Sequence, residues 1–236
     1  MVNIVAYVGS RNPMSSTLRS VKLTKQSLDS EFTADWTILT PNDIKILPVD
    51  GTGREFTEGI DYVEEARIDD SHRLKELFKS CDYLILGSPT YGHNVSGDMK
   101  IVMDRLTYWG HLFYLAPKPG MAFVSATTNG FLKVGSLLEL FMENLGIVIS
   151  PTVYNTTSTP FDQKKAIETA NTILSAVKDG INGKMLEPSV RQEAAFQMLS
   201  STYSRRDSND CEAKYWREHG FMKCESLNDY FRLAAR

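Results

Sequence analysis

NIVAYV at Asn3–Val8, followed by GSRNPMSST at Gly9–Thr17, is the part of this chain from which its architecture is most readily inferred. Residues 3–8 form an apolar run of the length of one buried strand, and a helical pattern of apolar residues begins at Leu18. A loop between a strand and a helix start is a potential anion site, because free backbone N–H groups and the positive end of the helix dipole face it. We therefore predict that a phosphate binds here. The alternative is that the hydroxyl residues at 15–17 only cap the helix.

This loop differs from both common nucleotide-binding loops. It lacks the lysine of the G-x-x-x-x-G-K-[ST] motif and the glycines of the G-x-G-x-x-G motif. Serine and threonine in their place indicate a phosphate that is held by hydroxyls and amides, with little fixed positive charge. The sequence therefore favours a phosphomonoester ligand at the carboxyl end of the first strand.

The composition is that of an ordinary globular protein, and it argues against several function classes. Of the 236 residues, 42% are hydrophobic and 23% are charged, and the net charge of −3 favours neither nucleic acid nor an anionic membrane as a partner. The three cysteines are widely spaced and form no C-x-x-C pair, so we expect neither a metal site nor a disulfide framework. The apolar runs are too short to span a bilayer and no signal-peptide pattern is present, so we expect a cytoplasmic protein.

Strand-like and helical segments alternate along the first 180 residues. Beyond the first strand, strands are predicted at residues 35–39 (with a short extension at 44–47), 83–87, 120–126 and 147–153, and the run at 83–87 is the clearest buried one. Helices are predicted at residues 16–30, 70–80, 97–106, 137–145 and 161–179, and a polar loop at residues 51–68. This alternation predicts an α/β fold with a doubly wound, five-stranded parallel sheet.

The last part of the chain, residues 181–236, has no strand-like run, and helices are predicted at residues 188–201 and 211–219. It also carries aromatic residues that need a surface to cover, among them Tyr203, Tyr215, Trp216, Phe221, Tyr230 and Phe231. We expect a helical C-terminal extension beside a domain formed by residues 1–180. Its aromatic residues either pack on that domain, or they cover a partner subunit or the mouth of the ligand site.

Three loops are expected to meet at one edge of the sheet, since each follows a buried strand. They are Ser10–Thr17, Ser88–Gly97 (SPTYGHNVSG) and Ser125–Gly130 (SATTNG), all rich in small polar residues. Backbone amides and glycines in such loops suit a planar polar ring, and Tyr91 offers a flat face for it. We predict a phosphate at one end of this edge and a planar ring along the other two loops.

These motifs resemble those of the NAD(P)H-dependent FMN reductase family, which belongs to the flavodoxin-like superfamily. The resemblance rests on the loop at Gly9–Thr17, on Gly87–Gly92 (GSPTYG) and on Ser96–Lys100 (SGDMK) before a helix, and it covers roughly residues 1–180. Residues 215–221 (YWREHGF) also resemble an end segment found in many members. The resemblance implies a flavodoxin-like sheet with strand order 2-1-3-4-5 and FMN as the cofactor.

The resemblance also implies a role for each loop. The FMN phosphate would be held by Ser10, Arg11, Ser15, Ser16 and Thr17. The isoalloxazine ring and the ribityl chain would be lined by Pro89, Thr90, Tyr91 and Gly92, with His93 near the ring. The pyrimidine side of the flavin would contact Ser125, Thr127, Thr128 and Gly130.

This chain departs from the family pattern at two places. Iron–sulfur members of the superfamily carry a compact cysteine motif after the second strand, whereas residues 50–68 contain no cysteine, so we expect no cluster there. The loop after the fourth strand lacks the double glycine that is often seen.

The function implied by the resemblance is that of an FMN-dependent NAD(P)H oxidoreductase. NAD(P)H would give a hydride to FMN, and a quinone, a nitro or azo compound, or another flavin would accept the electrons. This chemistry requires no side-chain base, so no catalytic residue is assigned, and the sequence does not choose between NADH and NADPH. Members of the family often form dimers, so we expect a homodimer or a homotetramer.

Three other functions remain open at this point. They are a flavodoxin-type electron carrier, a non-catalytic flavin-binding module, and a hydrolase with Ser15 or Ser16 as its nucleophile. A carrier of flavodoxin type would be expected to be shorter and more acidic than this chain, and no Ser-His-Asp arrangement is apparent in the sequence.

Overall fold

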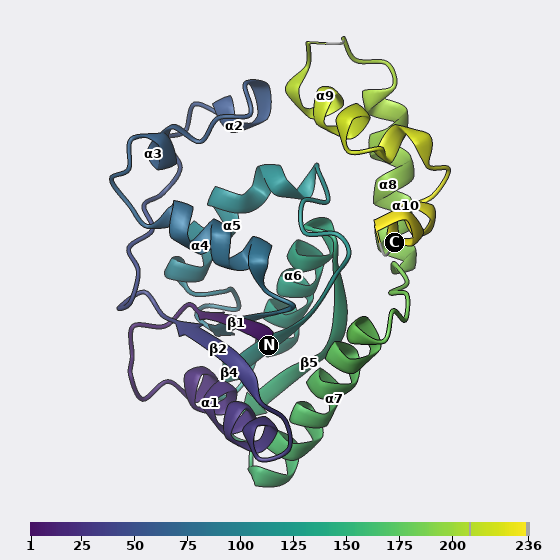
Figure 1. Ribbon diagram of the computed structural model, residues 1–236. Helices are drawn as coiled ribbons and strands as arrows, with labels where there is room; N and C mark the ends of the chain where they lie inside the picture. The colour runs from purple at the N-terminus through teal and green to yellow at the C-terminus, as the bar shows by residue number, and fades with distance from the viewer. Residues whose placement is uncertain (208, 235–236) are drawn as a thin grey trace.

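The computed structural model describes residues 1–207 and 209–234, and within them five strands form one sheet. The strands are β1 (Val2–Val8), β2 (Ala34–Leu39), β3 (Tyr83–Pro89), β4 (Lys118–Ala126) and β5 (Ile147–Thr156). Neighbouring strands are parallel and lie in the order β2-β1-β3-β4-β5 (Figure 1). The predicted doubly wound sheet and its strand order are confirmed.

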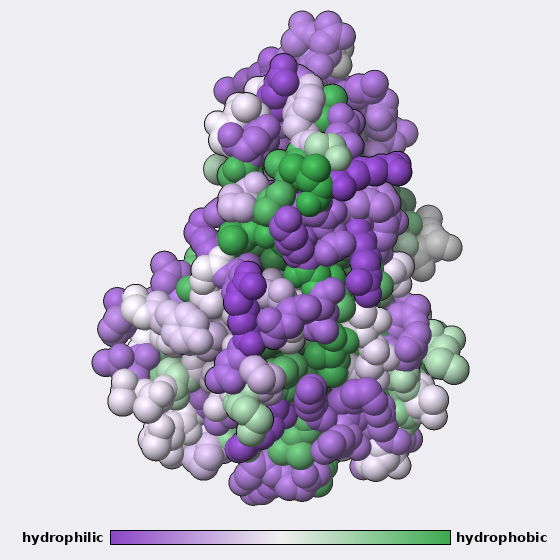
Figure 2. Space-filling model, turned by 90° about the vertical axis from the view of Figure 1, so that its left-hand side faces the viewer, coloured by the Kyte–Doolittle hydropathy of each residue, from purple (hydrophilic) through white to green (hydrophobic). Residues whose placement is uncertain are grey.

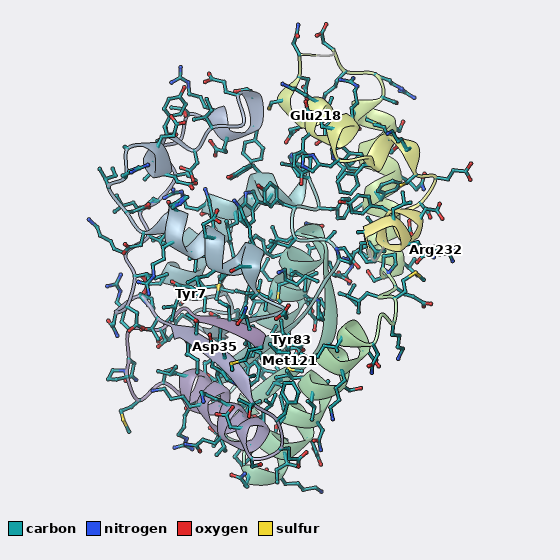
Figure 3. All side chains as sticks on the ribbon, in the orientation of Figure 1. Tyr7, Asp35, Tyr83, Met121, Glu218 and Arg232 are labelled. Atoms are coloured by element: carbon teal, nitrogen blue, oxygen red, sulfur yellow. The ribbon has the colours of Figure 1, made fainter. Side chains whose placement is uncertain are left out.

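Helices cover both faces of this sheet (Figure 1). One face carries α1 (Ser16–Asp29) and α7 (Gln163–Ile181), and the other carries α4 (Ser71–Ser80), α5 (Gly97–Gly110) and α6 (Phe131–Asn144). Because side chains alternate along a strand, Tyr7 belongs to the core on the α4–α6 side, while Tyr83 and Met121 belong to the core on the α1–α7 side (Figure 3). Burial of both faces explains why β1 and β3 consist of continuous apolar runs.

Two predictions for the segment after β2 are wrong. Residues 44–47 form no strand; the backbone N–H groups of Lys45 and Leu47 instead donate to the carboxylates of Asp70 and Asp69, at 2.7 and 3.0 Å. Residues 51–68 are not merely a loop, since they contain the one-turn helices α2 (Arg54–Thr57) and α3 (Tyr62–Glu65). Side-chain partners that lie 20 or more residues away determine the local structure here, and a periodicity pattern does not report them.

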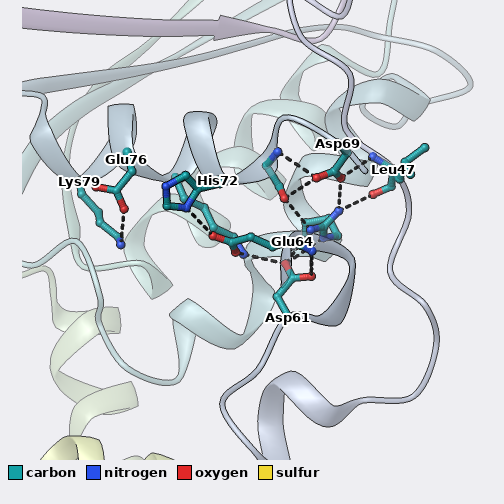
Figure 4. A network of polar contacts seen from close by, with 10 residues as sticks. Leu47, Asp61, Glu64, Asp69, His72, Glu76 and Lys79 are labelled. Carbon is teal, nitrogen blue, oxygen red and sulfur yellow. Dashed lines mark hydrogen bonds and ion pairs between the residues drawn. The ribbon is translucent and has the colours of Figure 1, made fainter. Parts of the chain in front are cut away.

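A buried ion network holds this segment against α4 and α5 (Figure 4). The guanidinium of Arg105 on α5 donates to both oxygens of Asp61 and to Asp69, at distances between 2.5 and 3.0 Å. Lys75 on α4 donates to Asp61 (2.6 Å) and to Glu64. Burial alone would raise the pKa of Asp61, but the hydrogen bonds and charges of Lys75 and Arg105 outweigh burial and lower that pKa.

The C-terminal extension contains α8 (Val190–Tyr203), α9 (Cys211–Glu218), a 3-10 helix (Phe221–Lys223) and α10 (Leu227–Ala234). The sequence predicts α8 and α9 but misses α10, which spans only about two turns. Ser208 and residues 235–236, which belong to the predicted extension, lie outside the described residues.

The aromatic residues of the extension form a core with the end of α5 and the chain that follows it. Trp216 Nε1 donates to the carbonyl oxygen of His111 at 2.8 Å, and Gln192 donates to the carbonyl oxygens of Glu143 and Ile147, each at 3.0 Å. The buried members of this core are Leu112, Phe113, Phe196, Tyr203, Ala213, Trp216, Phe221, Leu227 and Phe231. The extension therefore packs on the sheet domain, which is the simpler of the two expectations. A domain boundary near residue 180 stays a prediction.

Within residues 1–207 and 209–234, no helix combines the length and the apolar character needed to cross a membrane. Cys81 is buried beside β3, whereas Cys211 and Cys224 are half-buried in the extension, and all three thiols are free. The same residues contain no cluster of three or more His, Cys, Asp or Glu side chains that would hold a metal ion.

We expect Arg105→Met to lower the free energy of unfolding by about 3–5 kcal/mol, because it leaves the buried carboxylate of Asp69 without a cationic partner and leaves Asp61 with Lys75 alone. The matched control is Arg73→Met, since Arg73 lies exposed on α4. The pKa values of Asp61 and Asp69 are lowered in the fold, so the stabilisation is complete above the pKa of an unfolded Asp and is lost as the pH falls through the folded value. The difference in the free energy of unfolding between the wild type and Arg105→Met should therefore become smaller below about pH 4. Urea denaturation over a pH series measures both effects; a loss no larger than that of the control would contradict the role given to the network.

Candidate functional site

The loops that follow β1, β3 and β4 leave the sheet at the carboxyl ends of its strands, which point to the left in Figure 1. Figure 2 views this side of the molecule. Hydrophilic side chains cover most of it, and hydrophobic residues appear between them along its middle.

The loop after β1 is hydrogen-bonded to the loop after β3. The backbone N–H of Gly9 donates to the carbonyl oxygen of Gly87 (2.8 Å), and the hydroxyl of Ser96 donates to the carbonyl oxygen of Gly9 (2.5 Å). The backbone N–H of Ser96 in turn donates to the hydroxyl of Ser88 (3.0 Å). The approach is close: a Cβ added at Gly9 would lie 2.7 Å from the Cβ of Met99. Glycine at this position therefore permits α5 to begin against the first loop.

A second set of contacts joins α1 to the end of β4. The hydroxyls of Thr17 and Ser125 are hydrogen-bonded at 2.6 Å, and both residues are buried. The backbone N–H of Thr90 donates to the carbonyl oxygen of Ser125 at 2.8 Å. The hydroxyl residues predicted in the loop after β1 and in the loop after β4 thus lie close together. The hydroxyls of Thr17 and Ser125 are hydrogen-bonded to each other.

The tip of the loop after β3 is a two-residue hairpin. Tyr91 and Asn94 exchange two backbone hydrogen bonds (2.9 and 3.0 Å), and the φ angles of Gly92 and His93 are 56° and 61°. Positive φ at both central residues is the type I′ turn, in which glycine is favoured and histidine is uncommon. His93 lies against Gly130, since a Cβ added at Gly130 would be 3.0 Å from Nδ1 of His93. The hairpin leaves the Tyr91 side chain 59% exposed.

A cleft of about 410 Å³ opens beside these loops. Its lining consists of Ser16, Pro89, Thr90, Tyr91, Ser125, Ala126, Thr127, Asn155, Thr156, Thr157 and Pro160. Of the predicted site residues, six line this cleft; Gly92, His93, Thr128 and Gly130 lie beside it on the same loops, and Ser10, Arg11, Ser15 and Thr17 belong to the neighbouring first loop. Two larger clefts of about 600 Å³ lie outside these loops, one beside Asp61 and one beside Phe32, so size alone would not have selected this site.

The structure adds a fourth loop that the sequence prediction missed, Asn155–Pro160 (NTTSTP) after β5. The side-chain amide of Asn155 donates to the hydroxyl of Ser20 on α1 (3.0 Å), and its oxygen accepts from the backbone N–H of Phe161 (3.1 Å). The available signal was its composition, because it follows a predicted strand and is as rich in small polar residues as the other three loops.

The residues of the first loop have distinct partners. Ser15 caps α1 by accepting from the backbone N–H of Leu18 (3.5 Å), as the capping alternative expects. A role of Ser15 in holding the phosphate stays a prediction. Ser10 is buried and accepts from the backbone N–H of Asn12 (3.4 Å). Arg11 is exposed, and its hydrogen bonds to Asp98 raise the pKa of its guanidinium.

We expect Gly9→Ala to lower the free energy of unfolding by about 1–3 kcal/mol, because the added Cβ would lie within 3 Å of both Ser96 and Met99. Gly97→Ala is the control, since a Cβ there meets nothing within 4 Å. Thermal denaturation of the two variants gives the comparison. Equal stability of both variants would show that the loop after β1 is not in close contact with the loop after β3 and the start of α5.

A family model described as NADPH-dependent FMN reductase matches residues 2–160. An iron–sulfur flavoprotein from Archaeoglobus fulgidus is 27% identical over 160 residues, which is 65% of this chain and 72% of that protein. Among solved structures, RosB with a bound 8-demethyl-8-formylriboflavin-5'-phosphate has a TM-score of 0.64 at 12% identity over 88% of both chains. FerB, an NAD(P)H:acceptor oxidoreductase from Paracoccus denitrificans, has a TM-score of 0.52 at 18% identity over 75% of this chain and 96% of its own. These two likenesses are of fold. The match of the family model to more than half of the sequence shows that this chain belongs to the NADPH-dependent FMN reductase family.

Proposed function

We propose that this protein binds FMN across its four loops and transfers electrons from NAD(P)H to a small-molecule acceptor. The observation that carries the proposal is the convergence of these loops, two of them joined by the Thr17–Ser125 hydrogen bond, at the carboxyl edge of the sheet. Family membership supports flavin-dependent NAD(P)H oxidoreduction in general. A quinone, a nitro or azo compound, or free flavin as acceptor belongs to the proposal, as does a homodimer or homotetramer.

The residues at this edge fit FMN. The hydroxyl of Thr90 is buried, and within residues 1–207 and 209–234 it has no hydrogen-bond partner. Such a group costs free energy unless a ligand or a water pairs with it. Other polar groups of the cleft are hydroxyls and an amide, from Ser16, Thr127, Asn155 and Thr157, which suit a ribityl chain and the polar edge of a flavin.

For the phosphate, the first turn of α1 offers backbone N–H groups that have no carbonyl partner within the helix. Ser10 and the exposed hydroxyl of Ser16 flank this turn. Thr17 and Ser125 would set the spacing of the two loops through their mutual hydrogen bond. We therefore assign the phosphate to the first loop and the ring to the Tyr91–His93 hairpin and the loop at Ser125–Gly130.

Bound FMN would supply the hydride acceptor and donor of the reaction, which is the usual division of labour in a flavoenzyme. The cleft is lined by no Asp, Glu, His, Lys or Arg, so the side chains around it provide binding and orientation and no general base. Helix α6 begins at Gly130 without a side-chain cap, so its N-terminal N–H groups can stabilise negative charge on a neighbouring ring. The exposed Tyr91 offers a flat surface at the entrance.

The absorbance of the protein loaded with FMN tests the proposal. Stopped-flow mixing with NADPH, and separately with NADH, should bleach the flavin absorbance with a rate that depends on the concentration of the dinucleotide. A quinone added afterwards should restore the absorbance. A flavin that stays oxidised with both dinucleotides would indicate an electron carrier, and failure to bind any flavin would leave only a non-catalytic module.

We expect Ser10→Ala combined with Thr17→Ala to weaken FMN binding by about 30-fold. Ser10 loses a hydroxyl beside the phosphate, Thr17 loses the hydrogen bond to Ser125 that sets the spacing of the loops, and each loss costs about 1 kcal/mol. The control is Thr202→Ala with Ser204→Ala, two hydroxyls that bond only to carbonyl groups of α8. Fluorescence titration with FMN measures both. Unchanged affinity in the first variant would place the phosphate elsewhere.

A further inference from the structure

The side chain of Arg11 forms a two-pronged ion pair with Asp98 at the rim of the candidate site. Arg11 Nε and Nη2 donate to the two carboxylate oxygens of Asp98 at 3.0 and 2.8 Å. Asp98 lies in the first turn of α5, and Arg11 lies in the loop that precedes α1. The pair therefore links the loop assigned to the phosphate with the helix that follows the loop assigned to the ring.

Charged side chains are scarce in the four loops of the site. In residues 9–17, 88–97, 125–130 and 155–160, which are the four loops of the site, Arg11 is the only lysine or arginine and no Asp or Glu occurs. Lys165 reaches the last loop from α7 but donates to the carbonyl oxygens of Thr159 and Pro160 (3.2 and 2.9 Å). Burial raises the pKa of Tyr7, the other polar residue beside Asp98, so its phenol stays neutral. The carboxylate of Asp98 therefore cancels the single cationic side chain of these loops.

The ion pair leaves part of the Arg11 guanidinium available to a ligand. The bonds to Asp98 occupy one edge of the guanidinium and leave the N–H groups of Nη1 free. The carbonyl oxygen of Arg11 accepts from the side-chain amide of Asn42 (2.9 Å), which fixes the loop at this residue. The backbone therefore already holds Arg11 in the loop. We take the negative charge of Asp98 to be its main effect on a bound phosphate.

We propose that Asp98 limits the affinity of this site for the phosphate of FMN, so that the flavin exchanges with solution instead of remaining permanently bound. This inference rests on the proposed function. The phosphomonoester carries nearly two negative charges at neutral pH, so a carboxylate beside its binding loop weakens binding by simple repulsion. Replacing the carboxylate with an amide of the same shape removes that repulsion and leaves Arg11 uncompensated.

The test compares FMN with riboflavin, which shares the ring and the ribityl chain but has no phosphate. Apoprotein is titrated with each flavin at low ionic strength, for the wild type and for Asp98→Asn, Arg11→Gln and the double variant. We expect Asp98→Asn to tighten FMN binding by about tenfold and to leave riboflavin binding unchanged. Arg11→Gln should weaken FMN binding by a similar factor, and the double variant should return to the wild-type value, because its net charge at the rim is the same. Added salt should shrink all these differences.

Exchange of FMN with solution is measured by gel filtration of the proteins loaded with FMN. The wild type should lose its FMN on the column, and Asp98→Asn should retain it. Weaker FMN binding in Asp98→Asn would show that Asp98 orients Arg11 and would overturn the proposal, and so would an unchanged ratio of FMN to riboflavin affinity. Thermal denaturation shows whether each variant folds. If Asp98→Asn does not fold, the Arg11→Gln variant tests the proposal, and an FMN affinity equal to that of the wild type would contradict it. If neither flavin binds to the wild type, the proposed function fails and this inference fails with it.

Discussion

The buried hydrogen bond between Thr17 and Ser125 is the contact on which the candidate site most depends. It joins the first turn of α1 to the end of β4, across the end of β3 that lies between them. Two buried hydroxyls must be paired, because an unpaired one costs about 1–3 kcal/mol. The pairing therefore fixes how far the first loop stands from the other loops. Gly87 makes this approach possible, since a Cβ there would already lie 3.0 Å from the methyl group of Thr17.

Charge is used differently beside α5 and in the candidate cleft. At the C-terminal half of α5, Arg105 is buried among Asp61 and Asp69, and full charges hold the segment after β2 in place. The cleft, in contrast, is lined by hydroxyls, an amide and carbon atoms. A neutral lining suits a cofactor whose own charge changes during the reaction, because backbone dipoles can respond to either state without an ion pair that must be broken. The structure thus separates the charged residues that stabilise the fold from the neutral lining of the cleft, and the Arg11–Asp98 pair lies outside that lining.

The sheet could be predicted from the sequence because each strand is a short apolar run that ends in glycine or small polar residues. The loop at Gly9–Thr17 and the loop at Ser88–Gly97 could be predicted for the same reason. The irregular segment at residues 44–47 could not be predicted, since its two carboxylate partners come from residues 69 and 70. Residues 155–160 (NTTSTP) carry a compositional signal like that of the other three loops. The Arg11–Asp98 pair carries none, because it depends on a contact between residues 87 positions apart. Binding of FMN at these loops remains a proposal that sequence and geometry support together.

Hydrogen–deuterium exchange with and without FMN tests the central claim most directly, since it reports where the ligand acts without a mutation. If the four loops form one flavin site, FMN should slow exchange in peptides that cover residues 9–18, 88–97, 125–131 and 155–160 and leave the C-terminal extension unchanged. Protection confined to the segment around Asp61, or to α9, would place the flavin in another cleft and would contradict the account.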